Sequence, residues 1–428
     1  MRYFLPILFR YSSLILQFLV VVLITRRLEK EEAGVYFEIF GIINATYFLF
    51  GAGFPDGLVR FVAHADATGK REEIRSLIGR SALMSAVLAA AAILIGVAVG
   101  LVFEGPLITR AVIATTAAWW FCYGATFFAS QILVATGRSS LGAFFFYPAM
   151  NIALFVTSVP YLLLAARPTL ELTLAAAVGG GILCAGASSI CAVLATFSYP
   201  VSNNVRAQIA PVLRLGLPIG VSRLLQSCLY WIPVWAVGLW QGVAAAALFA
   251  TASRLNVAIA AVMAAIRFTI RPTIVRLAAR DDWAGIGREG QRTATVATVT
   301  AVVATLGAVT LGPPVIAFVF GEPYRDSAWI LAILMVGTLG ECVGGAVDEI
   351  LKMTGRAGLV LRLLATTVAI ETALVVAFSH LGLMATAATQ AVVFVGMYGT
   401  MLWIVKRRDG TWVGATARPS KFRSLFVG

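Results

Sequence analysis

Arginine is the residue in this sequence best placed to do chemistry, because several arginines interrupt long apolar stretches. Arg10, Arg223 and Arg254 each lie in such a stretch, away from charge-rich connections. A charge inside a membrane span costs about 2.5–3.5 kcal/mol on insertion scales, so these side chains are expected to face a cavity or a partner. A guanidinium offers a delocalised charge and a planar fork of donors that fits phosphate oxygens. The three residues therefore predict a cationic cavity for an anionic substrate, for example one that carries a pyrophosphate.

Arg60 and Arg271 complete the predicted substrate-binding set, although each also has a simpler explanation. Both lie at the inner end of an apolar stretch, where basic side chains set the orientation of a membrane protein without binding a substrate. Arg10 and Arg223 begin their stretches, so their long side chains could instead reach the membrane surface. The sequence leaves both interpretations open.

Three acidic residues are candidates for ion coupling or for charge pairing: Glu341, Asp348 and Asp56. Glu341 lies midway along an apolar stretch, where it would pair with an arginine or carry a proton. Asp348 is followed by Glu349 and lies near Lys352, so local pairing also explains it. Glu371 lies in a later apolar stretch.

The sequence shows no pattern typical of catalysis or of a metal site. The five cysteines all lie in apolar stretches and have no CxxC or Cys/His spacing, and neither histidine has a nearby set of ligands. There is no nucleophile with a base, and the connections predicted to face outward are short. We therefore expect no metal, no cofactor and no enzymatic activity.

The composition indicates which elements must position these residues. Of the 428 residues, 60% are hydrophobic and 12% are charged, and the mean hydropathy is +0.90. A soluble domain carries about 25% charged residues, and disorder requires high charge with little apolar surface. Both classes are excluded, and a polytopic membrane protein is predicted. The net charge of +13 fits basic cytoplasmic loops that meet anionic lipid better than it fits nucleic-acid binding.

Twelve apolar stretches are each long enough to cross a bilayer as a helix, which requires about 20 residues. Their approximate bounds are 4–25, 33–54, 77–103, 109–135, 141–165, 171–197, 212–239, 243–270, 293–320, 327–351, 357–379 and 382–405. The first has no small-residue cleavage site and is expected to be a span rather than a signal peptide.

Basic residues are concentrated in the even-numbered connections and in the tail at 406–428. The odd-numbered connections are poor in them except for the first, where Arg26, Arg27 and Lys30 are offset by three glutamates. Because basic loops stay on the cytoplasmic side, both termini are expected to be cytoplasmic.

The two halves of the sequence repeat each other. The motif Thr136-Gly137-Arg138 recurs as Thr354-Gly355-Arg356, and the residues around Val59-Arg60 recur around Val275-Arg276, at nearly the same offset. Six spans per repeat make the repeats parallel, an arrangement typical of transporters that bind substrate between their halves. The predicted fold is thus all-α, with two parallel six-helix lobes around a central cavity. The predicted divisions are an N-terminal lobe (1–200), a cytoplasmic linker (201–217), a C-terminal lobe (218–405) and a basic cytoplasmic tail (406–428).

With this organisation, the sequence resembles the polysaccharide flippases (Wzx-like) of the multidrug/oligosaccharidyl-lipid/polysaccharide exporter superfamily. The resemblance covers nearly the whole chain and is carried by several short motifs together. These are Arg26-Arg27-Leu28 with Glu31 to Tyr36, Gly53-Phe54-Pro55 with Val59 to Val62, Leu213 to Pro218, Ala246 to Phe249 with Ala252 to Leu255, Phe320-Gly321, and Met353 to Arg356. The stretch Trp231 to Trp235 differs, because many relatives carry an acidic or amide residue there.

The resemblance implies that the protein moves an undecaprenyl-pyrophosphate-linked oligosaccharide across a bacterial plasma membrane, by alternating access, for surface polysaccharide biosynthesis. It implies membrane lipids as surroundings, and a polysaccharide polymerase and other assembly proteins as partners. Two other classes stay open. One is an exporter of a small molecule, of multidrug-extruder or major-facilitator type, because Asp66 to Arg71 also resembles a major-facilitator loop. The other is a membrane glycan polymerase or ligase.

Overall fold

The computed structural model describes residues 4–200, 209–278 and 280–416, and within these ranges the chain is helical and contains no β-strand. The predicted all-α architecture is confirmed. The chain forms two compact units, here called unit 1 (Met1–Ser227) and unit 2 (Cys228–Gly428). The division falls inside a single helix, α9, which begins at Ala210 within the range predicted as a linker.

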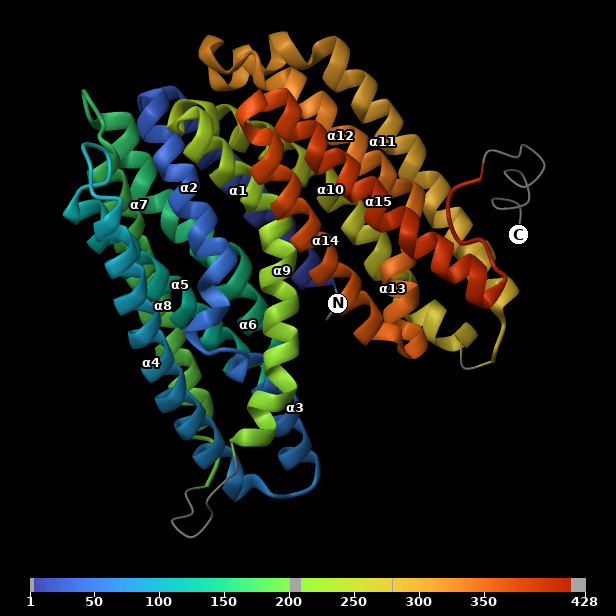
Figure 1. The fold of residues 1–428 in the computed structure, drawn as a ribbon. Helices are drawn as coiled ribbons and strands as arrows, with labels where there is room; N and C mark the ends of the chain where they lie inside the picture. The colour runs from blue at the N-terminus through green and yellow to red at the C-terminus, as the bar shows by residue number, and fades with distance from the viewer. Residues whose placement is uncertain (1–3, 201–208, 279, 417–428) are drawn as a thin grey trace. The chain divides into compact units, whose positions relative to one another are not determined.

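Among the described residues, unit 1 contains eight complete α-helices, two short helical turns and the first part of α9 (Figure 1). Their bounds are α1 (Phe4–Arg27), α2 (Lys30–Thr46), η1 (Tyr47–Phe50), α3 (Phe54–Ala67), α4 (Arg71–Val102), α5 (Arg110–Ala135), α6 (Ser139–Phe144), η2 (Phe145–Ala149), α7 (Met150–Leu164), α8 (Leu170–Thr196) and α9 (Ala210–Gln241).

Helix α5 forms the centre of unit 1, where it packs against α8, α3 and α4. It buries large aromatic side chains, Trp119 and Phe127 among them, and its glycine at 124 lies directly against the ring of Phe50. A side chain at this glycine would overlap the ring, so the small residue permits the close approach.

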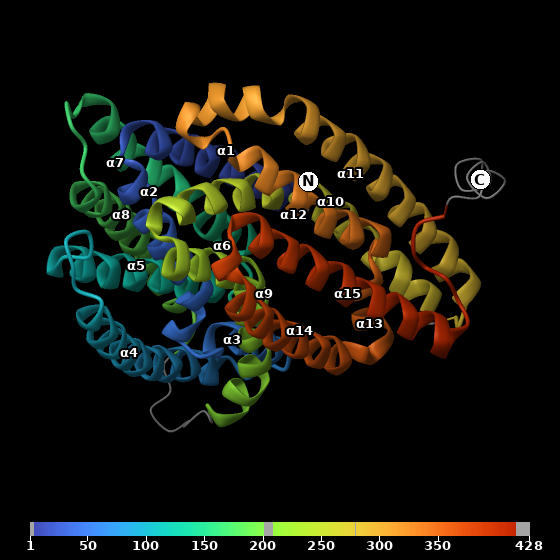
Figure 2. The ribbon, with the colours of Figure 1, turned by 45° about the horizontal axis from the view of Figure 1, so that its top comes forward.

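Unit 2 contains the rest of α9 and the remaining helices (Figure 2). Their bounds are α10 (Val243–Ala278), α11 (Trp283–Phe320), η3 (Glu322–Tyr324), α12 (Ser327–Gly344), α13 (Val347–Leu351), η4 (Lys352–Arg356), α14 (Ala357–Phe378), η5 (Ser379–Leu381) and α15 (Leu383–Asp409).

The helix contacts of unit 2 repeat those of unit 1. Helix α12 packs against α15, α11 and α10, as α5 packs against α8, α4 and α3. Helices α4 and α11 correspond in the two repeats. Both are peripheral, since only 11% of the most apolar 18-residue stretch of each helix is buried. Such an exposed apolar surface on a helix of this length is suited to contact with lipid.

The repeated Thr-Gly-Arg motif also has the same local structure in both units. Gly137 and Gly355 have φ angles of +81° and +82°, a left-handed conformation that favours glycine. In both turns the threonine hydroxyl, of Thr136 or Thr354, donates to the carbonyls three and four residues earlier. The internal repeat read from the sequence is thus visible in the backbone.

Eleven helical segments of the described part are long and apolar enough to cross a membrane. Helix α1, with 24 residues, covers the first predicted span. Two predicted spans are interrupted: 33–54 breaks at Ala52 and Gly53, and 327–351 breaks at Gly345, all with positive φ. Gly53 and Gly345 accept this conformation at little cost, and the chain turns at these points.

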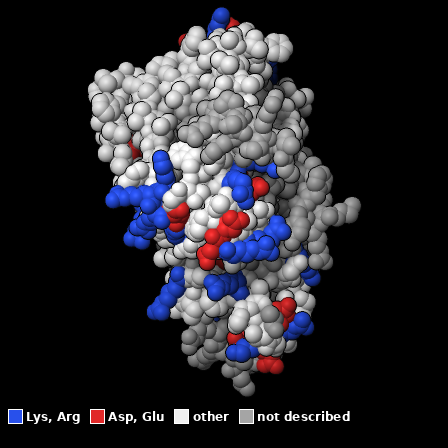
Figure 3. Space-filling model, turned by 90° about the vertical axis from the view of Figure 1, so that its right-hand side faces the viewer, with Lys and Arg blue, Asp and Glu red and all other residues white. Residues whose placement is uncertain are grey.

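Charged side chains gather on part of the surface. Figure 3 shows lysine, arginine, aspartate and glutamate together across the middle and lower part of one face, with few in its upper part. Such gathering of charged side chains is expected of a protein whose helix ends meet water while its helix sides meet lipid.

Candidate functional site

The predicted site residues Arg223 and Asp56 form an ion pair inside unit 1. Arg223, on α9, donates through Nη2 to Oδ1 of Asp56 at 2.7 Å. The aspartate side chain is only 6% exposed, whereas the arginine side chain is 34% exposed. The carboxylate is therefore almost completely withdrawn from solvent, and the guanidinium is only partly withdrawn.

Glycines in both helices bring this pair together. Asp56 lies in the first turn of α3, where an acidic side chain interacts favourably with the helix dipole. The backbone of α9 at Gly216 lies directly on that of Gly53, and Gly57 lies against the carbonyl of Val212. Because any side chain at these glycines would overlap the opposing backbone, α9 can cross the start of α3 closely enough for Arg223, two turns further on, to reach Asp56.

Aromatic rings surround the ion pair. The Arg223 guanidinium carbon lies 5.2 Å from the ring centroid of Phe127, within the range of a cation–π interaction. Tyr47 packs edge-on against Phe127 with ring centroids 5.0 Å apart, and Phe146 lies 5.4 Å from Phe127. A further ring, Tyr123, lies 5.4 Å from Tyr47. We call Tyr47, Tyr123, Phe127 and Phe146 the aromatic cluster.

The electrostatics of the pair follow from burial and proximity. Burial raises the pKa of the Asp56 carboxyl above its ordinary value, and the adjacent Arg223 guanidinium opposes that rise. A guanidinium carries five N–H donors; one of them donates to Asp56, and the Tyr47 hydroxyl interacts with the same guanidinium. Chemically, such a group can bind an anion while aromatic faces hold its plane in one orientation.

In unit 2, the predicted residue Arg254 lies half-buried on α10. Its guanidinium carbon is 5.3 Å from the ring centroid of Trp231, on the part of α9 that belongs to this unit. The buried polar side chains Asn256 and Thr338 join α10 to α12 through a 2.7 Å hydrogen bond. Unit 2 thus also places a guanidinium against an aromatic ring, and Trp231 belongs to the stretch in which the sequence differs from the flippases.

The predicted acidic residues of unit 2 lie in local contacts. Glu341 is 5% exposed and accepts a hydrogen bond from the Tyr398 hydroxyl at 3.1 Å. Lys352 lies 2.9 Å from Asp348 and 3.5 Å from Glu349, which is the local pairing that the sequence offered as an alternative. A proton-carrying role for Glu341 stays a prediction.

The remaining predicted arginines are less informative. Arg60 is exposed on α3. The side chains of Arg10 and Arg271 lie outside the part of the structure that is described. The structure therefore places three of the five predicted arginines, and it brings Arg223 into contact with one of the three predicted acids.

Some notable residues were absent from the predicted set. The aromatic cluster was not predicted, because aromatic residues occur in most of the apolar stretches and their spacing carries no distinguishing signal. Glu38 on α2 was also missed, and Glu371 on α14 was noted without a role. Both are acids inside apolar stretches, which is a signal visible in the sequence.

Comparison with known proteins identifies the fold. No protein-family model matches the sequence, and a comparison with curated protein sequences found no significant match. Among solved structures, an inward-facing multidrug resistance MATE family transporter of the MOP superfamily matches with a TM-score of 0.76 and 14% identity, over 93% of this chain and 95% of that one. The lipid II flippase MurJ, in an inward closed conformation, matches with a TM-score of 0.73 and 12% identity, over 98% of this chain and 90% of that one.

A third solved structure is a MOP superfamily transporter from Pyrococcus furiosus, described as having a binding pocket of reverse polarity that suggests a different function. It matches with a TM-score of 0.64 and 13% identity, over 95% of each chain. The chain therefore has the fold of MOP superfamily transporters, and the predicted fold class, an all-α multi-pass membrane protein, is confirmed.

Proposed function

We propose that this chain is a flippase that moves an undecaprenyl-pyrophosphate-linked oligosaccharide across the bacterial plasma membrane for surface polysaccharide biosynthesis. The observation that carries this proposal is the partly exposed guanidinium of Arg223, held by Asp56 and Phe127 on a membrane-spanning helix. A guanidinium maintained in such a place against the cost of desolvation fits an anionic cargo. A pyrophosphate would accept hydrogen bonds from the other N–H groups of this guanidinium.

Several further features support a lipid-linked cargo with a sugar head. The rings of the aromatic cluster provide apolar faces beside the guanidinium, on which sugar rings can pack. Arg254 beside Trp231 offers the same combination in unit 2. The fold is shared with a lipid II flippase. In this proposal both termini are cytoplasmic, the lipid tail stays in the bilayer, and a polymerase and other assembly proteins receive the flipped unit.

The test is the sidedness of the lipid-linked sugar in a bacterial strain that lacks this gene. We expect a complete polyprenyl-linked oligosaccharide to accumulate in the inner leaflet, where a probe added to intact spheroplasts cannot reach it. Accumulation in the outer leaflet would instead indicate a polymerase or ligase step. No accumulation, in a strain shown to make the glycan normally, would contradict the flippase proposal.

Complementation then tests the role of the guanidinium. The wild-type gene should restore outer-leaflet exposure, and the variant Arg223→Gln should not. Arg325→Gln is a matched control, because Arg325 is 58% exposed and pairs with Glu322 at a helix end. Equal complementation by both variants would remove Arg223 from the proposed substrate path.

A second candidate is the export of a small molecule, which the fold shared with a multidrug transporter favours. An exporter would confer resistance to, or efflux of, soluble compounds without changing the leaflet distribution of any lipid-linked sugar. Efflux by purified protein in proteoliposomes, with the same Arg223→Gln variant, separates the two functions.

A further inference from the structure

Helix α12 and the short helix α13 are two pieces of one predicted span, and they are separated by a break at Gly345. The backbone there has φ +60° and ψ −121°, far from helical values. In an unbroken helix the Val343 carbonyl would accept a hydrogen bond from the Val347 amide, four residues later. In the structure this carbonyl accepts a hydrogen bond from the Ala415 amide at 2.9 Å. A segment beyond the last helix thus supplies the bond that a continuous helix would supply.

This segment, residues 410–416, is here called the strap. It follows α15 and lies on α11 and on the end of α12. Gln291 of α11 donates to the Trp412 carbonyl at 2.8 Å. Val413 is 1% exposed and lies so close to Gly290 that a side chain at this glycine would overlap it. The strap is therefore packed into unit 2 as part of its interior.

Helix α11 holds the strap and the break together. The backbone of Gly345 lies directly against Ala294 of α11, since a side chain at Gly345 would overlap that residue. Ala294 is four residues after Gly290, on the same face of the helix. The two consecutive glycines at the break, Gly344 and Gly345, are poor helix formers. The contacts around them, those of the strap included, therefore decide whether the helix breaks.

Unit 1 shows the other conformation of the same element. Gly345 and Phe127 each lie nine residues before the threonine of the repeated Thr-Gly-Arg motif. Helix α5, Arg110–Ala135, nevertheless runs without a break through Phe127 and ends directly before its motif. The shared scaffold therefore accommodates a continuous helix at this place as well as a broken one.

We propose that the strap is a conformational lock of unit 2. It holds α12 and α13 in the broken form, and its release lets them join into one continuous helix that resembles α5. The Ala415 amide and the Val347 amide compete for the Val343 carbonyl, so only one of the two forms can have this bond at a time. On the basis of the proposed transport function, the transition between the two forms accompanies movement of the substrate.

The lock can be tested on the purified full-length protein in lipid nanodiscs by pulsed electron paramagnetic resonance. After replacement of the five native cysteines, spin labels at Val336 in α12 and at Met353 beyond α13 report the distance across the break. A continuous helix would place these two backbone positions about 26 Å apart. With the natural strap the distance should be shorter. Ala415→Pro removes the competing amide and should shift the distance toward the longer value, whereas Ala415→Ser retains the amide and should not.

A second variant opens the lock from the side of α11. Gly290→Val places a side chain where Val413 now lies and should displace the strap, even if the proline variant folds poorly. Gly307→Val is the matched control, because it lies on the same helix with no neighbouring atom within 4 Å. Unchanged distances in both Ala415→Pro and Gly290→Val would overturn the proposal, because the break would then be maintained without the strap.

A reversible cross-link separates this proposal from the proposed function. The Thr416 amide donates to Thr295 Oγ1 at 3.2 Å, so cysteines at these two positions can fasten the strap to α11. If the chain is a flippase, oxidation of this pair in proteoliposomes should stop flipping, and a reductant should restore it. Flipping that continues with the strap fastened would refute the role of release in transport. A distance shift in the strap variants of a protein that flips no lipid would support the lock and refute only the function.

Discussion

Asp56 in unit 1 and Glu371 in unit 2 are both almost completely buried carboxyl groups, but only Asp56 has a cationic partner. Asp56 is paired with Arg223 at 2.7 Å, and Glu371 has no hydrogen-bond partner in the described part of the chain. The two units nevertheless share their helix contacts and their Thr-Gly-Arg turn. The comparison shows that the repeated scaffold has been retained while the interior chemistry of the two repeats has diverged.

The largest expected effect on stability comes from removing the guanidinium of Arg223 in unit 1. Arg223→Ala leaves the Asp56 carboxylate buried without its partner, which should lower the free energy of unfolding by about 3 kcal/mol. Denaturant titration in detergent would measure it. The double variant Asp56→Asn with Arg223→Gln should recover most of the stability but no transport. Recovery of transport would mean that the pair is purely structural.

A matched pair of amide substitutions tests the difference between the two acids directly. Asp56→Asn removes the negative charge that Arg223 contacts and should cost about 1–2 kcal/mol of stability. Glu371→Gln replaces a buried carboxyl group that has no hydrogen-bond partner among the described residues with a neutral side chain of similar shape, and should change stability by less than about 1 kcal/mol. The same titration would compare the two variants, and the opposite order would contradict this difference between the paired and the unpaired acid.

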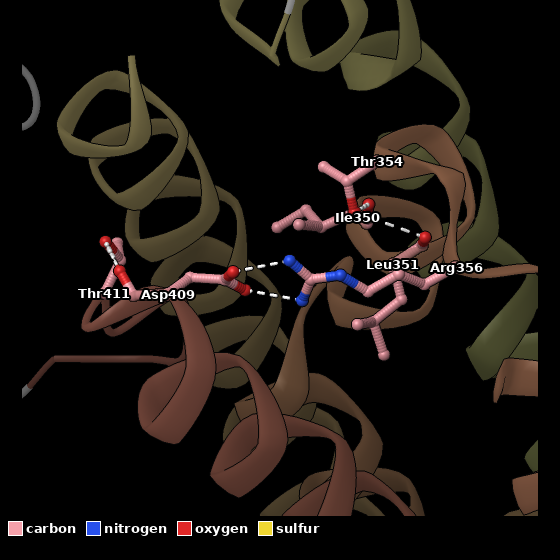
Figure 4. A network of polar contacts seen from close by, with 6 residues as sticks. All are labelled: Ile350, Leu351, Thr354, Arg356, Asp409 and Thr411. Carbon is pink, nitrogen blue, oxygen red and sulfur yellow. Dashed lines mark hydrogen bonds and ion pairs between the residues drawn. The ribbon is translucent and has the colours of Figure 1, made fainter. Parts of the chain in front are cut away.

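A smaller contrast is expected between the arginines of the repeated turn. Arg356 donates to both carboxylate oxygens of Asp409, at 2.6 and 2.5 Å (Figure 4). Its guanidinium carbon also lies 5.5 Å from the ring centroid of Trp283. Arg138, its counterpart, is exposed. Arg356→Ala should destabilise by about 1–2 kcal/mol, and Arg138→Ala by no more than about 0.5 kcal/mol. Equal losses in thermal stability would show that the second turn does not depend on its ion pair.

The smallest difference between the units is expected for alanine substitutions at the glycines of the repeated turn, which should lower stability equally in both. Gly137→Ala and Gly355→Ala each place a side chain at positive φ where no neighbouring atom interferes, so both should cost about 1 kcal/mol through backbone strain alone. Gly79→Ala, inside α4 beyond its second turn and with no neighbouring atom within reach, should instead stabilise by about 0.5–1 kcal/mol. Unequal losses at Gly137 and Gly355 would indicate that the turns are not equivalent.

Much of the fold could be predicted because apolar length and the internal repeat are properties of the sequence itself. The bounds predicted for α14, 357–379, agree with the structure to within a residue. The breaks at Gly53 and Gly345 were not predicted, since a glycine in an apolar stretch is equally compatible with a continuous helix. Backbone conformation at such residues is set by the packing around them.

The site was harder to predict than the fold. Arg223 and Asp56 were both singled out, but they are 167 residues apart, and sequence spacing does not indicate such a contact. Arg27 shows a related difficulty. The sequence indicates only a loop charge that nearby glutamates offset, yet in the structure Arg27 donates to the Leu162 and Ala165 carbonyls at the end of α7. A charge that satisfies helix-end carbonyls contributes to folding as well as to topology.

The segment after α15 has a consequence for how the protein is made. Residues 410–416 lie along α11 and α12: Gln291 donates to the Trp412 carbonyl, and the Ala415 amide donates to the Val343 carbonyl beside the break at Gly345. Val413 is 1% exposed against Gly290. During synthesis, α11 and α12 leave the ribosome long before this segment exists. The ends of these helices therefore stay incompletely packed until translation has passed α15.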